Sequence, residues 1–202
     1  MKILNLFAGI GGNRTNWGDE HEITAVDLDE KALEIYHKRF PNDKIVVADA
    51  YEYVVEHFNE FDFVWASPPC KTHSRLNAFK QNIRLPDLRL YELIIFLKQY
   101  FDGKWVVENV VPYYELLIPP TIQLSRHLFW SNFTIPRMNF QQPKGILKDL
   151  KIEILQEWHN IYETTNREYL RNCVDWRIGK YILDCAENNV FSLDKYMMEE
   201  EK

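Results

Sequence analysis

The feature that most constrains the fold is the alternation of short apolar runs with amphipathic stretches along the first half of the chain. The apolar runs have the length of β-strands, and the amphipathic stretches have the apolar spacing that is typical of helices. Strands that alternate with helices predict βαβ units, a parallel sheet and right-handed crossovers. We therefore predict an α/β fold, with strands at residues 2–7, 22–27, 44–49, 61–66 and 104–110 and helices at 29–40 and 87–101.

The alternation is less regular after residue 120. A strand is predicted at 127–133, a helical or mixed segment at 145–162 and a helix at 175–189. A further helix is expected soon after the glycine turn at 8–13. No low-complexity or linker-like stretch divides the 202 residues, so one compact domain with a small appendage is expected.

The composition is that of a globular protein, with 46% hydrophobic and 14% aromatic residues. The first apolar run is too short for a signal peptide, and no segment approaches the ~20 apolar residues of a membrane helix. Cys70, Cys173 and Cys185 form no Cys-x-x-Cys pair, which favours a reducing compartment over disulfides or a structural metal site. A cytoplasmic protein with no membrane partner is therefore expected.

The charge is unevenly distributed. The formal net charge of -6 argues mildly against a nucleic-acid partner, because phosphate binding normally needs a basic face. Between residues 71 and 89, however, five basic residues accompany the single acidic residue Asp87. A solvated surface and a phosphate-contacting loop are both open interpretations. The basic residues are Lys71, Arg75, Lys80, Arg84 and Arg89.

Residues suited to binding a nucleoside follow the first three predicted strands, at the edge where open α/β sheets bind ligands. The turn "AGIGG" places Gly9, Gly11 and Gly12 after the first strand, where bare backbone can approach a ligand. Asp27 ends the second strand and can accept hydrogen bonds from the ribose hydroxyls. Asp49 ends the third strand and can accept a hydrogen bond from the adenine amino group. Each aspartate alone is also a common turn or N-cap residue. Together with the glycines they predict a site for an adenosyl cofactor.

The stretch "FDFVWASPPC" closes an apolar strand with two prolines and then places a cysteine. Pro68 and Pro69 cannot donate ladder hydrogen bonds, so Cys70 lies just beyond the strand, at the edge where Glu108 ends another strand. A free cysteine is most often a small buried hydrophobic residue. A cysteine and an acid at one ligand-binding edge instead favour a nucleophile and its supporting acid.

These segments, in this order, resemble the motifs of the DNA cytosine-5 methyltransferase family. The similar segments are "LFAGIGG", "AVDLDEKALEIYHKRFP", "VVADA", "SPPCKTHS" and "VVENV". "IQLSRHLFW" is similar to the family's later Gln-x-Arg-x-Arg-x-Phe motif, and "YLRNCVDWRIGKYIL" to its closing Gly-Asn-x-Val segment. The resemblance covers nearly the whole chain and is strongest through residue 110. It implies the Rossmann-like fold of class I S-adenosylmethionine-dependent methyltransferases, with a mostly parallel sheet covered by helices on both faces.

The resemblance implies methyl transfer from S-adenosylmethionine to the ring carbon of a cytosine flipped out of double-stranded DNA, through a covalent adduct with Cys70. Glu108 would stabilise the developing charge, and Lys71, His73 or Arg75 could supply a positive field that activates the thiol. The implied catalytic residues are Cys70, Glu108, Arg126 and His127, and the implied DNA contacts are Lys71, Ser74, Arg75, Lys80 and Arg84. The implied cofactor residues are Phe7, Ala8, Gly9, Ile10, Gly11, Gly12, Asp27, Leu28, Asp49, Ala50, Pro68, Asn172 and Cys173.

The chain departs from the family pattern at several positions. Lys71 stands where a glutamine usually follows the cysteine, and Arg171 stands where a glycine precedes the closing asparagine. In the later motif Ser125 and His127 hold the two arginine positions unless Arg126 is displaced by one. Which of Arg126 and His127 contacts the pyrimidine therefore stays open.

The resemblance also predicts how the chain is divided. A catalytic and cofactor-binding domain is expected at 1–135, a reduced target recognition region at 136–168, and a C-terminal helix that completes the cofactor-binding domain at 169–202. A recognition region this short leaves room for a separate specificity partner or a restriction endonuclease.

Two alternative functions stay open. "SPPC" is one residue from the Ser-Pro-Pro-aromatic loop of amino-directed DNA methyltransferases, which need no nucleophile and have no role for Glu108. A non-catalytic DNA- or cofactor-binding accessory subunit would suit the acidic charge and the short recognition region, but binding alone calls for neither Cys70 nor Glu108.

Overall fold

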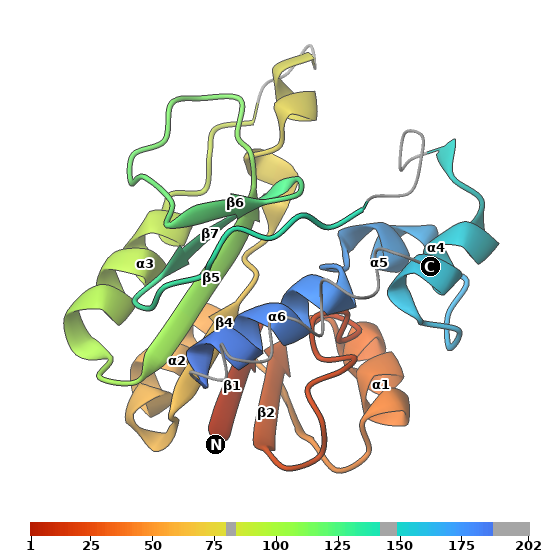
Figure 1. Ribbon diagram of the computed structural model, residues 1–202, viewed down its shortest axis with the longest axis horizontal. Helices are drawn as coiled ribbons and strands as arrows, with labels where there is room; N and C mark the ends of the chain where they lie inside the picture. Colours follow the sequence, from red (N-terminus) through yellow and green to blue (C-terminus); the bar gives the residue numbers. More distant parts are fainter. Residues whose placement is uncertain (80–83, 142–148, 188–202) are drawn as a thin grey trace.

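The computed structural model describes residues 1–79, 84–141 and 149–187. Its centre is a seven-stranded sheet with the strand order β3-β2-β1-β4-β5-β7-β6 (Figure 1). The first five strands are parallel, whereas β7 pairs antiparallel with both β5 and β6. The strands are β1 Lys2–Leu6, β2 Glu22–Asp27, β3 Lys44–Val47, β4 Phe63–Ala66, β5 Lys104–Val110, β6 Ile122–Leu124 and β7 His127–Ser131.

Helices cover both faces of the sheet. Successive strand residues face opposite sides, so Trp65 of β4 packs in a cluster with Ile178 of α6, whereas Val64 packs in another cluster with Ile94 of α3. This arrangement confirms the predicted Rossmann-like fold. None of the helices in the described ranges is long and apolar enough to span a membrane. The helices are α1 Glu30–Arg39, α2 Ala50–His57, α3 Arg89–Tyr100, α4 Ile152–His159, α5 Arg167–Asn172 and α6 Trp176–Ala186, with short 3₁₀ turns η1 Phe58–Glu60, η2 Cys70–Thr72 and η3 Arg75–Phe79.

The connection between β1 and β2 differs from the prediction. Residues 7–21 form turns and bends, so the helix expected after the glycine turn is wrong. Trp17 is fully buried, with its ring centroid 5.7 Å from that of Trp65. Arg14 is also buried and pairs with Asp43 at 2.9 Å. These contacts with distant residues determine the local conformation, and a sequence pattern confined to this segment does not reveal them.

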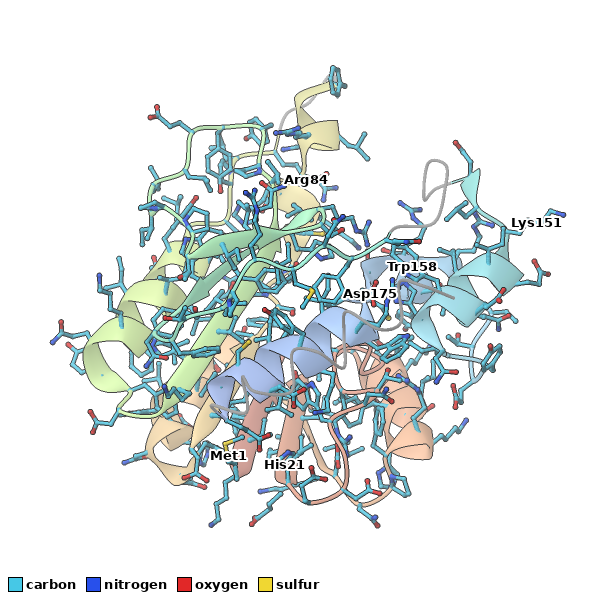
Figure 2. The ribbon with its side chains drawn as sticks, viewed as in Figure 1. Met1, His21, Arg84, Lys151, Trp158 and Asp175 are labelled. Carbon is cyan, nitrogen blue, oxygen red and sulfur yellow. The ribbon has the colours of Figure 1, made fainter. Side chains whose placement is uncertain are left out.

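The segment after residue 149 packs against the main sheet domain. Leu155 and Ile161 are fully buried in a cluster with Ile10 of the glycine turn and with α1. Trp158 of α4 donates from Nε1 to Asp175 Oδ2 at 3.0 Å, which joins α4 to the start of α6 (Figure 2). The predicted recognition region and C-terminal segment also include residues 142–148 and 188–202, which lie outside the described residues.

Candidate active site

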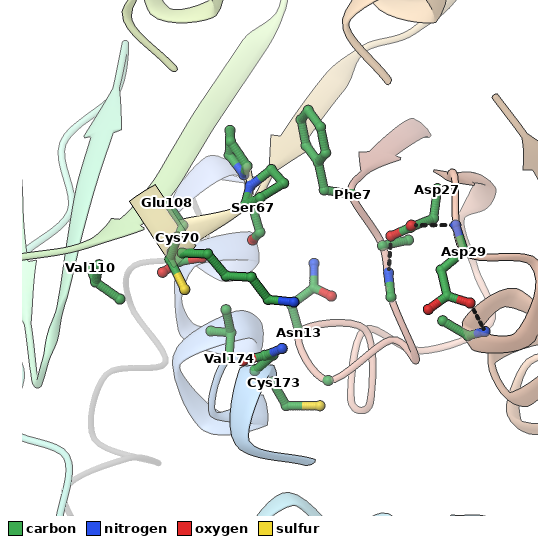
Figure 3. A pocket seen from close by; sticks show the side chains of 18 of the residues that line it. Phe7, Asn13, Asp27, Asp29, Ser67, Cys70, Glu108, Val110, Cys173 and Val174 are labelled. Atoms are coloured by element: carbon green, nitrogen blue, oxygen red, sulfur yellow. Dashed lines mark hydrogen bonds between the residues drawn. The ribbon is translucent and has the colours of Figure 1, made fainter. Parts of the chain in front are cut away.

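A cavity of about 720 Å³ opens at the carboxyl ends of the parallel strands. Figure 3 shows Cys70 and Glu108 on one side of it and Asp27 on the other. All the predicted catalytic and cofactor residues except Gly11 line this cavity. They are Phe7, Ala8, Gly9, Ile10, Gly12, Asp27, Leu28, Asp49, Ala50, Pro68, Cys70, Glu108, Arg126, His127, Asn172 and Cys173.

The glycine turn presents bare backbone to the cavity. Gly9 has a φ of +52°, and a Cβ atom at this position would meet no atom within 4 Å. Its N–H donates to Asp27 Oδ2 at 2.8 Å, and the N–H of Asp29 donates to Asp27 Oδ1 at 2.9 Å. Because each carboxylate oxygen has a second lone pair, Asp27 is held in one orientation and can still accept ligand hydroxyls.

Gly11 and Gly12 are required by packing. A Cβ atom on Gly11 would lie 2.8 Å from the ring of Tyr36, and one on Gly12 would lie 2.6 Å from Cβ of Cys173. Gly11 does not line the cavity, whereas Gly12 does. The turn therefore combines an open position at Gly9 with two close approaches that bring α1 and the C-terminal segment against it.

Asp49 is the N-cap of α2 and also lines the cavity. Its Oδ1 caps α2 by accepting the N–H of Tyr51 at 2.8 Å, and its Oδ2 lies 3.8 Å from Nη1 of Arg89. The Arg89 guanidinium lies 4.5 Å from the centroid of the Tyr51 ring, and Phe7 meets that ring edge-on at 4.9 Å. Leu28, which is 67% exposed, lines the same cavity. A carboxylate next to aromatic and apolar surface suits a purine ring.

Cys70 lies at the start of η2, directly after the two prolines, and β4 ends at Ala66 as the prolines require. Asn109 donates from Nδ2 to the carbonyl of Pro68 at 3.0 Å, which holds this turn against β5. Cys70 is a free, partly buried thiol. Burial raises the pKa of Cys70 most, the charge of Glu108 raises it further, and Arg126 lowers it.

The positive field at Cys70 has a different main source from those predicted. His73 is 1% exposed, and burial lowers its pKa, so its ring is neutral at pH 7 and supplies no positive charge. Arg126 lowers the pKa of Cys70 more than Lys71 does. The expectation for His73 is therefore wrong, because its side chain lies inside the protein.

Glu108 is buried at the end of β5. Burial raises the pKa of Glu108 to about 7, against the opposing effects of a hydrogen bond with Ser67 and of the charge of Arg126. His127 Nδ1 lies 3.8 Å from Glu108 Oε1, and burial lowers the pKa of His127 to about 3. Because His127 is neutral at pH 7, it places no positive charge beside Glu108, and a large share of the Glu108 carboxyl stays protonated. A protonated carboxyl can donate a hydrogen bond to a ring nitrogen.

A tight hairpin between β6 and β7 brings Arg126 to the cavity. Leu124 pairs with His127, which leaves Ser125 and Arg126 as the two-residue loop. Ser125 has a φ of +55°, the left-handed conformation that such short loops require. Arg126 donates from Nη2 to the carbonyl of Arg171 at 3.2 Å. Arg126 and His127 both line the cavity, whereas Ser125 does not.

α5 and the residues after it form the C-terminal wall of the cavity. Lys71 Nζ pairs with Glu168 at 2.8 Å, and the hydroxyl of Tyr169 donates to Asp29 at 2.9 Å. α5 therefore bridges the Cys70 turn and the turn after β2. Burial raises the pKa of Cys173 to about 12, so this thiol stays protonated and is no competing nucleophile.

The residues predicted to contact DNA occupy two positions. Lys71 and Ser74 line the cavity, whereas Arg75 and Arg84 are exposed outside it. Lys80 lies outside the described residues.

Twelve of the residues that line the cavity were not predicted, and four of these have polar side chains near predicted site residues or near Asp29. Arg89 and Tyr51 lie near Asp49, Ser67 lies near Glu108, and Tyr169 lies near Asp29. In the sequence Arg89 ends the basic run, but its position at the start of α3 separates it from the exposed loop. Ser67 directly precedes the two prolines of the "SPPC" motif, and this position was the feature of the sequence that could have placed it in the site.

The chain is similar to known proteins in sequence and in fold. The profile of the family described as C-5 cytosine-specific DNA methylase matches residues 1–110, more than half of the chain. The human tRNA (cytosine(38)-C(5))-methyltransferase is 27% identical over 206 residues, which cover 85% of this chain and 53% of the human protein. The rat protein of the same name is 28% identical over 82 residues, covering 38% of this chain and 21% of that one.

The fold also resembles that of a mutant of Spodoptera frugiperda DNMT2. The TM-score is 0.45 at 23% identity, and the match covers 71% of this chain and 55% of that one. The present chain spans about half the length of the human relative. On the family match, the chain belongs to the C-5 cytosine-specific DNA methylases.

Proposed function

We propose that the chain methylates the ring carbon of a cytosine flipped out of double-stranded DNA, through a covalent adduct with Cys70. One observation carries this proposal: Cys70, Glu108 and Arg126, from separate parts of the chain, line one cavity together with the glycine turn and Asp27. A module that only binds DNA or the cofactor needs neither a nucleophilic cysteine nor a supporting acid in this cavity. Amino-directed methylation has no role for the protonated acid.

S-adenosylmethionine is the cofactor of this family, and the cavity is suited to it. Gly9 leaves open space beside its backbone, and Asp27 is oriented with free acceptor capacity for ribose hydroxyls. Asp49 would accept the adenine amino group, with Phe7 and Tyr51 beside the purine. When bound, this cofactor supplies an activated methyl group.

The side chains would then divide the chemistry between them. The Cys70 thiolate adds to the ring carbon next to the one that is methylated, which makes the latter nucleophilic. Glu108 donates a hydrogen bond to the ring nitrogen and stabilises the charge that develops there, and the positive charge of Arg126 favours the thiolate. After methyl transfer, a second base takes the proton from the methylated carbon, the ring double bond re-forms, and the electron pair of the bond to Sγ leaves with Cys70 as the thiolate.

The nucleic acid would contact the loop that follows Cys70. Lys71 and Ser74 are placed to contact it at the cavity, and the exposed Arg75 and Arg84 are placed to contact phosphates. Although the overall charge is -6, this loop is a locally basic stretch suited to such contacts.

We further propose the division of the chain into a catalytic and cofactor-binding part at 1–135, a reduced recognition region at 136–168 and a C-terminal segment at 169–202 that completes the cofactor site. The position of Asn172 and Cys173 in the cavity wall supports the last part. A recognition region this short favours a separate specificity partner.

A cytosine in tRNA is a second candidate substrate. The observation that favours it is the match to the human protein named a tRNA (cytosine(38)-C(5))-methyltransferase, which extends over 85% of this chain. Both candidates share the same cavity chemistry and differ in the polymer that carries the base.

Mass analysis of nucleosides tests the proposal and separates the candidates. The protein is incubated with S-adenosylmethionine carrying an isotope-labelled methyl group and with either duplex DNA or tRNA. We expect labelled 5-methylcytosine in DNA, and label in the tRNA arm alone would move the proposal to tRNA. Label on an exocyclic amino group, or in neither polymer, would overturn cytosine-5 methylation.

Asp27→Ala should weaken S-adenosylmethionine binding by on the order of 1–3 kcal/mol, because the ribose hydroxyls and the N–H of Gly9 lose their acceptor. Calorimetry with the full chain measures this change. Asp62→Ala is the matched control, since Asp62 also accepts a backbone N–H, from Lys2, but lies outside the cavity wall. Equal affinity in the two variants would exclude Asp27 from the cofactor site.

A further inference from the structure

We propose that His73, Tyr114 and Tyr91 form a positioning relay that holds the Cys70 turn against the strand carrying Glu108. None of the three lines the cavity, so they act through the Cys70 turn and not through contact with the substrate. The inference rests on the role proposed above for Cys70.

Backbone contacts join the two segments on either side of the relay. The N–H of His73 donates to the carbonyl of Cys70 at 3.0 Å, and the N–H of Tyr113 donates to the carbonyl of His73 at 3.1 Å. Ser74 forms an antiparallel bridge with Pro112. The turn after β4 is thereby attached to the loop that directly follows β5, and His73 lies at the point of attachment.

The side chains of the relay form a directed chain of hydrogen bonds. The hydroxyl of Tyr91 accepts the N–H of Leu117 at 3.5 Å and donates to the hydroxyl of Tyr114 at 3.3 Å. The proton of Tyr114 is therefore free for Nδ1 of His73, 2.6 Å from its oxygen. This direction requires a neutral His73 that accepts at Nδ1, which agrees with the lowering of its pKa by burial.

Removing a member of the relay would disturb the geometry of the reaction. Without the Tyr114 hydroxyl, the buried Nδ1 of His73 loses its partner, and a buried polar atom without a partner favours rearrangement of the turn around it. Cys70 would then shift relative to Glu108. A misplacement of about 1 Å at reacting atoms can lower a rate by about 100-fold.

The first test measures covalent capture of an oligonucleotide whose target cytosine carries fluorine at the methylated carbon. Tyr114→Phe and His73→Leu should lower the capture rate at least about tenfold, while the Kd for S-adenosylmethionine stays unchanged. His73→Asn should recover most of the rate, because its Oδ1 can accept the Tyr114 hydroxyl. Tyr181→Phe is the matched control: it removes a hydroxyl that donates to the Pro136 carbonyl at 3.0 Å, away from the cavity.

The second test needs no nucleic acid. The rate at which iodoacetamide alkylates Cys70 is followed by mass spectrometry across a range of pH. Tyr114→Phe should change the rate or its pH midpoint, whereas Tyr181→Phe should change neither. Should Tyr114→Phe fail to fold, Tyr91→Phe keeps the Tyr114 hydroxyl and removes the bond that orients it, together with the acceptor of the Leu117 N–H, and should give a smaller change in the same measurement.

The two tests distinguish the relay from the proposed function. Absence of capture by the natural chain would contradict the function and leave the alkylation rates as the test of the relay. If the natural chain captures the oligonucleotide and Tyr114→Phe shows the same capture and alkylation rates as the natural chain, the relay is overturned and the proposed function stands.

Discussion

Cys70→Ser should abolish methyl transfer, with a fall in rate of at least about a thousandfold. Burial raises the pKa of the Cys70 thiol and the charge of Arg126 lowers it. A serine hydroxyl in the same place is far less acidic than a thiol and stays protonated, so addition to the cytosine ring is lost. The same variant should form no covalent adduct with DNA that carries fluorine at the methylated carbon. S-adenosylmethionine affinity should change little, because Asp27 and Asp49 are retained on the other strands.

Cys185→Ala is the control for this substitution. Cys185 is a free thiol buried in the core on α6 and does not line the cavity, so its loss should leave both the adduct and methyl transfer in place. Retention of methylation by Cys70→Ser would contradict the covalent mechanism. In that case methylation of an exocyclic amino group would become the leading explanation, since that reaction needs no nucleophile.

The inner parallel strands β1, β2, β4 and β5 were predictable because they are covered on both faces. Strands buried on both sides are continuous apolar runs, and β4 is such a run, with all four residues buried. The prolines after it locate Cys70 at the ligand edge, and "KWVVENV" has the bounds of β5. Where local sequence and tertiary burial agree in this way, both the strand and the position of the site residue follow from the sequence.

The remaining errors arise where distant contacts decide the local structure. The turn after β1 is held by the burial of Trp17 and Arg14, so the helix expected there is absent. Arg126 reaches the cavity because a tight hairpin turns it there, although the motif places its neighbours at the arginine positions. His73 is charged or neutral according to its burial, and no spacing in the sequence reports that burial.

Burial of Glu108 keeps an acid available in the cavity and lowers the free energy of unfolding at neutral pH. In the unfolded chain its carboxyl releases the proton near the ordinary pKa of 4.5, whereas in the folded chain it keeps the proton up to about pH 7. Between these values the folded state binds more protons, so the free energy of unfolding falls as the pH rises and stays lowered above pH 7. Below about pH 4.5 both states are protonated and the penalty disappears.

Glu108→Gln should therefore raise the free energy of unfolding at pH 8 by roughly 1–3 kcal/mol and leave it nearly unchanged at pH 4. Denaturant unfolding at the two pH values measures the difference. Methyl transfer should fall by about 100-fold or more, because an amide is a weaker donor to the developing charge than a carboxylic acid. Exposed Glu115→Gln is the matched control and should change neither quantity.

The same variant should also alter the reactivity of Cys70. Burial raises the pKa of the Cys70 thiol most, and the charge of Glu108 raises it further. Removal of that charge should therefore move the alkylation of Cys70 to lower pH even though methyl transfer becomes slower. Faster alkylation with slower methylation would show that thiolate formation alone does not limit the reaction and that the acid at the ring nitrogen is needed. If Glu108→Gln instead kept the natural rate, stability and alkylation profile, Glu108 would have no part in the site.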